Sequence, residues 1–276
     1  MRAMTFDDVP AGLRLCRLSG WNQVAEDWNT FLEFSPGACR VAERGGAVAG
    51  TLATLRFGEA FSWIAMILVD PAVRGQGIGT ELIREALAIL KDEKCVRLDA
   101  TEAGARIYRR EGFVEEYRLT RMIAKIPVQS SDVEERSCMP ISPNDLHEIF
   151  DLDRKVFAAD RSKLLRSFFA RAPELAWVAR TGATLDGYVF GRHGYHHEHV
   201  GPLAATSEGI ARKLLSCCLA KQPKRSFLID VPESWSDSLR SAGFVPERPL
   251  LRMYRGSKVW PPCEPYQFAI AGPEFG

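Results

Sequence analysis

The spacing of apolar and polar residues predicts alternating strands and helices in the first half of the chain. Short apolar runs bounded by turn-forming residues predict strands over residues 2–6, 39–43, 49–57 and 61–69. The last run contains almost no polar residue, which indicates burial on both faces. Apolar residues three and four positions apart predict helices over residues 9–18, 20–28 and 80–92.

The pattern continues to residue 122 and is then repeated. We expect a strand near Val96, a helix that ends at Gly112, and two closing strands that finish near Met122. An aspartate, a Gly-Phe pair and an Arg-Met pair then recur at equal intervals in both halves. They are Asp99, Gly112-Phe113 and Arg121-Met122, then Asp230, Gly243-Phe244 and Arg252-Met253.

A glycine-rich turn follows the buried strand. Asp70-Pro71 ends the strand, Arg74 and glycines 75, 77 and 79 form the turn, and a helix begins at once. Glycine lets the backbone turn tightly and approach a ligand closely, and a helix N-terminus presents free N–H groups. Arg74 adds a permanent charge with forked donors. The turn therefore predicts a site for phosphate oxygens, and for a pyrophosphate in particular.

Two other phosphate-binding motifs fit this turn less well. A P-loop needs a lysine that is absent here. A dinucleotide fingerprint spaces its glycines differently, although Asp99 stands where a ribose-binding acid would be, so a dinucleotide-dependent enzyme stays an alternative. The run Arg74-Gly-Gln-Gly-Ile-Gly79 resembles instead the acetyl-CoA pyrophosphate loop of the GNAT superfamily of N-acetyltransferases, in which Arg/Gln-x-x-Gly-x-Gly/Ala is the signature.

A second segment carries the same resemblance. Tyr108 stands in a predicted helix four residues before Gly-Phe, as a tyrosine does in GNAT proteins. The resemblance gives Tyr108 the role of general acid that protonates the thiolate of departing CoA, which suits a phenol with a pKa near 10. Where GNAT proteins often have asparagine, this chain has Thr101, whose hydroxyl could hydrogen-bond a pantetheine amide.

The resemblance implies an α/β (α+β) fold of two tandem GNAT-like domains, each a mixed, mostly antiparallel sheet flanked by helices. We expect a catalytic acetyl-CoA-binding domain over residues 1–125, a polar linker over 126–137, and a second GNAT-like domain with a tail over 138–276. The implied cofactor-binding residues lie on the strand end, in the turn and near Tyr108. They are Ile67, Leu68, Val69, Arg74, Gly75, Gln76, Gly77, Ile78, Gly79, Thr80, Thr101 and Tyr108.

The second copy of the repeat differs where the chemistry would be. Thr206 aligns with Arg74, Ser207 with Gly75, Ala211 with Gly79, and Leu239 with Tyr108. The copy therefore lacks the cation, two glycines and the acid. We expect it to keep the fold, to have lost acetyl-CoA, and to complete the active site or bind the acceptor, or else only to stabilise the protein.

The base that takes the amine proton stays open. Many GNAT proteins carry a carboxylate on the strand before the loop, but residues 61–69 contain none. Glu59 lies just before that strand, and Glu26 and Asp27 lie on the second predicted helix, which often lines the acceptor pocket in this superfamily. Each carboxylate could equally be a solvated charge.

The acceptor is expected to be a small-molecule amine, with a peptide N-terminus or a lysine as alternatives. Trp21, Trp28 and Trp63 accompany the acidic residues, and indole faces attract ammonium groups. The other interpretation is that these tryptophans belong to the core. Neither choice settles the oligomeric state, and a monomer and a homodimer both stay open.

Composition narrows the class of protein. The formal net charge of +1 gives no reason to expect nucleic acid or an acidic membrane as a partner. No apolar run is long enough to span a bilayer, and no signal peptide is recognisable. Seven cysteines, an odd number without a C-x-x-C pair, indicate reduced thiols and a cytoplasmic protein.

The segment His193–His199 holds four of the five histidines. It lacks a spacing usual for zinc, so we expect no metal there but a loop or pocket wall, in which a histidine could contact the acceptor. The tail over residues 259–276 is too apolar for a disordered end, and we expect it to pack back onto the protein.

Two functions are weighed from these features. The first is an N-acetyltransferase that moves acetyl from acetyl-CoA to a primary amine by direct attack in a ternary complex. The second is an acetyl-CoA-binding sensor with little turnover. Tyr108 favours the enzyme, because a sensor needs no acid beside the sulfur, whereas the missing strand carboxylate favours the sensor.

Overall fold

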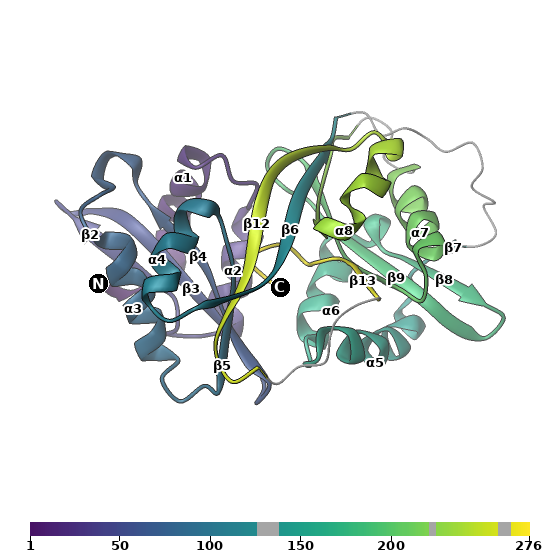
Figure 1. Cartoon of the computed structure of the whole chain (residues 1–276), viewed down its shortest axis with the longest axis horizontal. Helices are drawn as coiled ribbons and strands as arrows, with labels where there is room; N and C mark the ends of the chain where they lie inside the picture. The colour runs from purple at the N-terminus through teal and green to yellow at the C-terminus, as the bar shows by residue number, and fades with distance from the viewer. Residues whose placement is uncertain (126–137, 221–224, 259–265) are drawn as a thin grey trace. The chain divides into compact units, whose positions relative to one another are not determined.

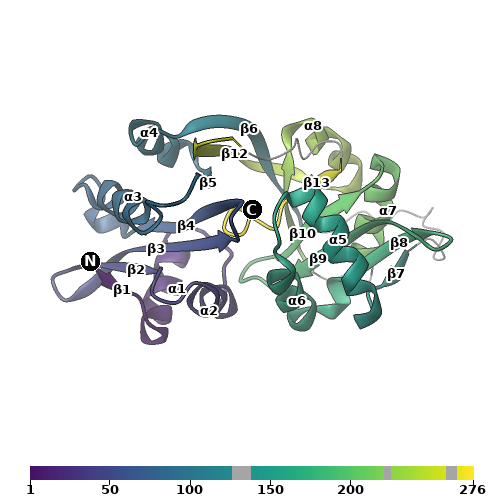
Figure 2. The ribbon, with the colours of Figure 1, turned by 90° about the horizontal axis from the view of Figure 1, so that it is seen from below.

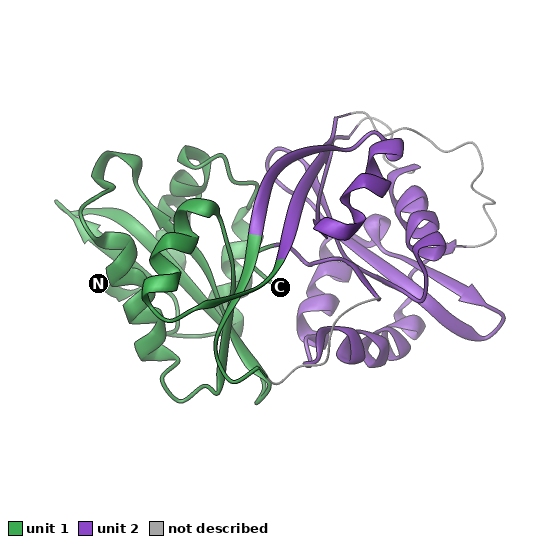
Figure 3. Ribbon diagram, in the orientation of Figure 1, with its two compact units in different colours: residues 1–117, 251–259, 273–276 green, residues 118–250, 260–272 purple. Residues whose placement is uncertain are grey.

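The computed structural model describes residues 1–125, 138–220, 225–258 and 266–276 (Figure 1). The predicted linker over 126–137 and residues 259–265 of the tail lie outside this part. The chain forms two compact units (Figure 3). The first consists of Met1–Tyr117, Leu251–Val259 and Pro273–Gly276, and the second of Arg118–Leu250 and Trp260–Gly272.

The first unit is a sheet between two pairs of helices. Its strand order is β1-β2-β3-β4-β5-β12, with α1 and α2 on one face and α3 and α4 on the other (Figure 2). Pairing is antiparallel except between β4 and β5. The elements are β1 Arg2–Ala3, α1 Val9–Leu18, α2 Ala25–Phe34, β2 Arg40–Arg44, β3 Ala47–Phe57, β4 Phe61–Val69, α3 Ile78–Ile89, β5 Cys95–Ala100, α4 Glu102–Arg110 and β6 Val114–Ala124.

The second unit repeats this arrangement in the order β6-β11-β10-β9-β8-β7, and β13 pairs with β10. Among its described strands, β10 and β11 pair in parallel. The elements are β7 Cys138–Pro140, α5 Leu146–Phe157, α6 Ser162–Arg171, β8 Trp177–Thr181, β9 Thr184–Arg192, β10 Glu198–Ala205, α7 Glu208–Ala220, β11 Phe227–Pro232, α8 Glu233–Ser236, β12 Val245–Gly256 and β13 Gln267–Ala269. Short 3-10 turns are η1 Phe6–Asp8, η2 Pro71–Val73, η3 Pro143–Asp145, η4 Pro173–Leu175 and η5 Asp237–Ala242. Both sheets have the mixed, mostly antiparallel character that the sequence predicts.

Two strands run from one unit into the other, which the sequence analysis did not foresee. In the first unit, residues 251–256 of β12 pair with β5; in the second, residues 119–124 of β6 pair with β11 (Figure 3). The prediction of two closing strands near Met122 was therefore wrong. The single strand β6 ends the first repeat, and the strand next to β5 comes from the far end of the chain.

The repeated aspartates and arginines explain this exchange. Arg252 lies opposite Asp99 in the register and donates two hydrogen bonds of 2.8 Å to its carboxylate. In the second unit Arg121 binds Asp230 in the same two-pronged way, again at 2.8 Å. These side chains are almost completely buried. A buried ion of either sign needs its partner, so each exchanged strand is fixed by a charge pair.

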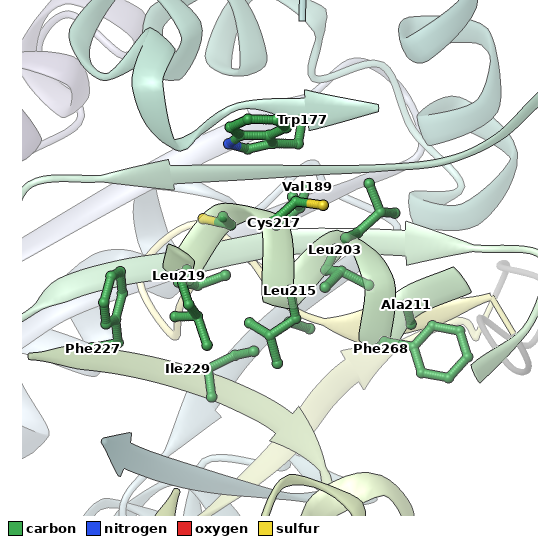
Figure 4. Close-up of a cluster of buried hydrophobic side chains, with 14 of the residues drawn as sticks. Trp177, Val189, Leu203, Ala211, Leu215, Cys217, Leu219, Phe227, Ile229 and Phe268 are labelled. Carbon is green, nitrogen blue, oxygen red and sulfur yellow. The ribbon is translucent and has the colours of Figure 1, made fainter. Parts of the chain in front are cut away.

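Each sheet buries an apolar face under its central helix. In the first unit, Ile78, Leu82 and Ile83 of α3 pack on the sheet. In the second, Leu215 and Leu219 of α7 meet Phe227 and Ile229 of β11 (Figure 4). None of the described helices is long and apolar enough to cross a membrane.

One predicted helix is displaced. The helix expected over residues 20–28 begins at Ala25 and continues to Phe34. The Asp27 carboxylate accepts a hydrogen bond of 3.0 Å from the Val24 N–H, and this bond satisfies a donor that has no partner inside the helix. Trp21 therefore lies before the helix and not on it.

Candidate functional site

Strand β4 separates from β5 at a bulge. The parallel register includes Ser62 with Val96 and Trp63 with Arg97, and ends there. Three residues further on, Met66 has φ +55°, a conformation that is costly for a side chain of this size. The Thr51 hydroxyl on β3 donates a buried 2.8 Å hydrogen bond to the Met66 carbonyl and holds the bulge in place.

Beyond the bulge, residues 67–69 form an edge without a partner strand on the β5 side, among the strands that the structure describes. We call this stretch the β4 edge. The Asp70 N–H donates to Ala49 on β3, and backbone groups alternate in direction along a strand, so the Val69 groups face away from β3. The Val69 carbonyl accepts a 3.1 Å hydrogen bond from Arg74 Nε. The edge thus leads directly to the predicted loop cation.

The turn after β4 is fixed by Asp70. Its carboxylate accepts a 3.0 Å hydrogen bond from the Ala72 N–H and caps η2. Arg14 donates to the same carboxylate at 2.6 Å and to the Val48 carbonyl at 2.7 Å. The hydrogen bond from Arg14 lowers the pKa of Asp70, which favours the charged carboxylate that accepts both hydrogen bonds.

The glycines of the turn are not equivalent. Gly75 has φ +80° and Gly77 has φ +85°, a region where a side chain is strained. Gly77 is also the N-cap of α3, and no side chain caps the first N–H groups of that helix. A Cβ at Gly79, in contrast, would meet only Ile107 Cδ1 at 3.5 Å and Val69 Cγ2 at 3.8 Å, which are ordinary contacts. Gly75 and Gly77 therefore make an exposed backbone cradle suited to an anion.

Tyr108 lies on α4 and turns back over Gly104. A Cβ on Gly104 would stand 2.9 Å from Tyr108 Cε2, so glycine is required for this ring position. Burial raises the pKa of the Tyr108 phenol above its usual value, which keeps its proton in place over the physiological range. Sequence reasoning missed Gly104, although a glycine inside a helix costs about 1 kcal/mol and is itself a signal.

The Thr101 side chain begins the same helix. Its hydroxyl oxygen accepts a 3.3 Å hydrogen bond from the Gly104 N–H, so Thr101 is the N-cap of α4. Only its own O–H could then be offered to a ligand. The structure brings Thr101, Gly104 and Tyr108 together as one unit, in which the cap fixes the helix turn that carries the phenol.

The predicted acceptor residues are placed differently. Trp28 and Trp63 are completely buried. The Arg252 guanidinium lies 4.8 Å from the centre of the Trp63 ring, and Trp28 covers Gly12 so closely that a Cβ there would stand 2.8 Å from its Cε2. Neither ring offers a face to an ammonium ion in this structure, and Trp21 alone is partly exposed.

The candidate bases also have distinct surroundings. Asp27 is buried and accepts the Val24 N–H described above. Glu26 is exposed on α2, and Glu59 is exposed in the turn between β3 and β4. The role of these three carboxylates as the base stays a prediction.

In the second unit the equivalent edge is filled by the chain's own tail. β10 pairs with β11 as far as Val200, bulges at Gly201-Pro202, and then pairs with β13 through Leu203 and Ala204. The Ile270 N–H donates 3.0 Å to the Asp230 carbonyl on β11. The tail therefore occupies the space into which β10 and β11 diverge. A Cβ on Gly201 would stand 2.0 Å from the Ile270 carbonyl oxygen, so glycine is required there.

The loop of the second unit is also shorter. Residues 70–77 separate β4 from α3, whereas only Thr206 and Ser207 separate β10 from α7. The second unit therefore lacks most of the turn, and not only the counterparts of Arg74 and Gly75. Tyr266 is exposed, but most of tail residues 267–276 are buried, as the sequence predicted for the tail.

The histidines of residues 193–199 differ in burial: His199 is buried, whereas His193 is exposed. His199 is buried, with Arg192 Nη2 2.9 Å from its Nδ1 and Asp230 Oδ2 3.1 Å from its Nε2. His193 lies between carboxylates, 2.7 Å from Glu198 and 3.1 Å from Glu174. In the described part of the chain, no group of three His, Cys, Asp or Glu side chains could hold a metal ion.

Comparison with known proteins places both units in one group. Two models for the acetyltransferase (GNAT) domain match, one over residues 35–115 and one over 149–269. The chain is 26% identical to holothin acyltransferase of Pseudoalteromonas sp. (strain SANK 73390), over 99% of this chain and 95% of that one.

Two solved structures share the architecture over nearly the whole chain. A Pyrococcus horikoshii protein provisionally assigned as an acetyltransferase is 25% identical, with a TM-score of 0.80 over 100% of this chain and 95% of its own. A tandem GNAT protein from the clavulanic acid biosynthesis pathway is 18% identical, with a TM-score of 0.62 over 94% of this chain and 98% of its own. The second likeness concerns the fold alone.

Proposed function

Because the chain belongs to the GNAT superfamily of acetyltransferases, we propose that its first unit transfers an acetyl group from acetyl-CoA to a primary amine of a small molecule. The observation that carries this proposal is the β4 edge, which opens directly onto the Gly75–Gly77 cradle. An extended amide-containing arm and a pyrophosphate are the two chemical parts of CoA that such an edge and such a cradle suit.

The residues of the first unit then divide the work of binding. Backbone groups of Ile67, Leu68 and Val69 hydrogen-bond the extended arm, and the N–H groups from Gly75 to Thr80 receive the pyrophosphate. Arg74 now donates to the Val69 carbonyl, and Nη2 lies 3.4 Å from Ser19 Oγ. This guanidinium is exposed and can add a charge-assisted hydrogen bond to a phosphate oxygen.

Acetyl-CoA supplies the acetyl thioester, and the chain supplies position and protons. Holding amine and thioester together removes much of the entropic barrier to their reaction. Tyr108 is the proposed donor of the proton to the departing sulfur. Burial raises the pKa of the phenol, so the phenol is protonated before the transfer. Glu26 and Asp27 stay the candidates for taking the amine proton. Asp27 would act from within the α2 cap and Glu26 from the surface.

We propose further that the second unit binds no acyl-CoA. The edge of β10 is already hydrogen-bonded to β13, and the turn before α7 lacks the residues for a cradle. The second repeat then serves the first unit by supplying residues 251–256, which belong to that unit and pair with β5.

The test is thiol release from acetyl-CoA over a panel of primary amines, together with calorimetric binding of acetyl-CoA to wild type and Arg74→Ala. The proposal expects saturable binding that weakens in the variant and release with at least one amine. Saturable binding without release from any amine would favour the sensor. Absence of binding would contradict both functions.

A further inference from the structure

The last residue of the β4 edge is already hydrogen-bonded by a side chain. The Val69 carbonyl, which faces away from β3, accepts a 3.1 Å hydrogen bond from Arg74 Nε. In a complete sheet, a neighbouring strand would supply a backbone N–H at such a carbonyl, so the guanidinium takes the place of that donor. A ligand arm that pairs along the edge uses the same carbonyl, and Arg74 therefore competes with it.

A second contact holds the guanidinium in this position. Arg74 Nη2 lies 3.4 Å from the Ser19 hydroxyl oxygen at the end of α1. In the described part of the chain Arg74 forms an ion pair with no carboxylate, and the acid of the turn, Asp70, is bound at 2.6 Å by Arg14. Both acceptors of the Arg74 guanidinium are thus neutral. A phosphate oxygen is charged and binds a guanidinium about twice as strongly as a neutral acceptor does.

The cradle begins at the residue after Arg74. Gly75 follows directly and Gly77 caps α3, and the Arg74 side chain is exposed. Rotation about the bonds of an exposed side chain moves the guanidinium while the backbone of the turn stays in place. The guanidinium that now lies on the edge is therefore also the one placed to bind a pyrophosphate in the cradle.

The second unit closes its edge by a different means. There β13 pairs with β10 through Leu203 and Ala204, and Thr206 stands at the position aligned with Arg74. A paired strand is held by several backbone hydrogen bonds and by its buried side chains. The closure in the first unit consists of two hydrogen bonds from one exposed side chain, so a single charged ligand group is enough to remove it.

We propose that Arg74 closes the β4 edge of the free protein and opens it when a pyrophosphate draws the guanidinium into the cradle. This inference rests on acetyl-CoA as the ligand of the first unit. It makes Arg74 a specificity-determining residue. An acyl donor that has the pantetheine arm without the pyrophosphate must break both hydrogen bonds of Arg74 and forms no phosphate contact instead. The site therefore selects acyl-CoA over acyl-pantetheine.

The test measures two dissociation constants by calorimetry, one for acetyl-CoA and one for acetyl-pantetheine, which has the same thioester and arm but no pyrophosphate. Arg74→Ala should weaken acetyl-CoA binding about fivefold, because the phosphate contact is lost. The same variant should tighten acetyl-pantetheine binding about fivefold, because the closing hydrogen bonds no longer have to be broken. If Arg74 only attracted phosphate, acetyl-pantetheine binding would stay unchanged.

Two further variants serve as controls. Arg56→Ala removes an exposed arginine that also donates to a backbone carbonyl, that of Ile89 at 2.9 Å, and should change neither Kd more than about twofold. Ser19→Ala removes a contact of the closed position alone, so it should weaken the binding of neither ligand.

The inference is overturned if Arg74→Ala binds acetyl-pantetheine no more tightly than wild type does, or if Arg56→Ala tightens that binding equally. Thiol release over the panel of amines is measured on the same proteins. A wild type that binds acetyl-CoA but releases no thiol contradicts the acetyltransferase function, and the two dissociation constants still decide the role of Arg74. A wild type that binds no acetyl-CoA contradicts both.

Discussion

The edge of β4 and the edge of β10 are the same structural feature in two different states. Both strands pair in parallel with their neighbour, bulge, and then diverge from it. At β4 the edge leads to a turn with two left-handed glycines; at β10 it is paired with β13, and the turn is almost absent. The comparison shows that one repeat keeps the fold while the tail of the chain pairs along the edge that, in the other repeat, has no partner among the described strands.

What both units keep is equally informative. Asp99 with Arg252 and Asp230 with Arg121 are buried, two-pronged pairs at matching positions of the two sheets. In each pair the arginine belongs to the repeat that did not supply the aspartate. The fold therefore depends on residues common to both copies, whereas the acetyl-CoA binding that we propose depends on residues that only the first copy has.

The largest effect on stability is expected from breaking the buried arginine–aspartate pairs, which both units have. Arg252→Ala removes the two arginine hydrogen bonds of the buried Asp99 carboxylate, and Arg121→Ala removes those of Asp230, which keeps His199 Nε2 at 3.1 Å. Each change should lower the free energy of unfolding by about 3–5 kcal/mol, which urea denaturation measures. Arg44→Ala is the control, because its 3.1 Å pair with Glu81 is exposed and contributes at most about 1 kcal/mol. Losses no larger than that of the control would contradict the structural role of the exchanged strands.

The next largest effect is expected from removing the Tyr108 hydroxyl, because the second copy has Leu239 at this position. Tyr108→Phe keeps the ring over Gly104 but removes the acid, so kcat should fall roughly 100-fold or more, with the Kd of acetyl-CoA unchanged. Burial raises the pKa of Tyr108. A general acid must be protonated, so this group should cause no alkaline decline in kcat below about pH 10. The matched change Tyr195→Phe, in an exposed loop, should leave kcat as it is. Equal kcat in both variants would exclude Tyr108 as the acid.

A smaller effect compares one glycine from each unit. Gly77→Ala places a side chain at φ +85°, and the strain of about 1–2 kcal/mol should weaken acetyl-CoA binding roughly tenfold. Gly209→Ala alters the corresponding glycine of α7, where a Cβ meets nothing closer than Ser207 Oγ at 4.0 Å, and should leave binding unchanged. Calorimetry on both variants distinguishes them, and equal weakening in both would mean that the second unit takes part in binding.

The smallest effect is expected at Gly79. Its Cβ would make only ordinary contacts, and the second repeat has Ala211 at this position. Gly79→Ala should therefore change the Kd of acetyl-CoA less than about twofold, because the added methyl group causes no strain. A tenfold loss would show that the ligand approaches this backbone closely, and that Gly79 belongs to the cradle with Gly75 and Gly77.

Local features of the first unit could be predicted from the sequence because their causes are local. The glycine turn, the helix that follows it and the place of Tyr108 in a helix all depend on neighbouring residues. The start of α2 was misplaced because the apolar spacing of Trp21 and Val24 suggested a helix, whereas the Asp27 cap sets its beginning at Ala25.

The long-range features could not be read in the same way. The repeat showed that Asp99 and Arg121 recur as Asp230 and Arg252, but equal spacing does not say which arginine meets which aspartate. The left-handed Met66 depends on Thr51 from the neighbouring strand. A threonine within the apolar run of β3 was the one signal available. The filling of the second edge depends on residues more than sixty positions beyond β10.

The central claim is that one edge binds acetyl-CoA and the other is filled by the chain. Calorimetric titration of acetyl-CoA into wild type and Arg74→Ala tests it most directly. The account predicts one site per chain in wild type, weakened in the variant through loss of the charged contact. Two sites per chain, or a single site whose affinity Arg74→Ala does not change, would contradict it.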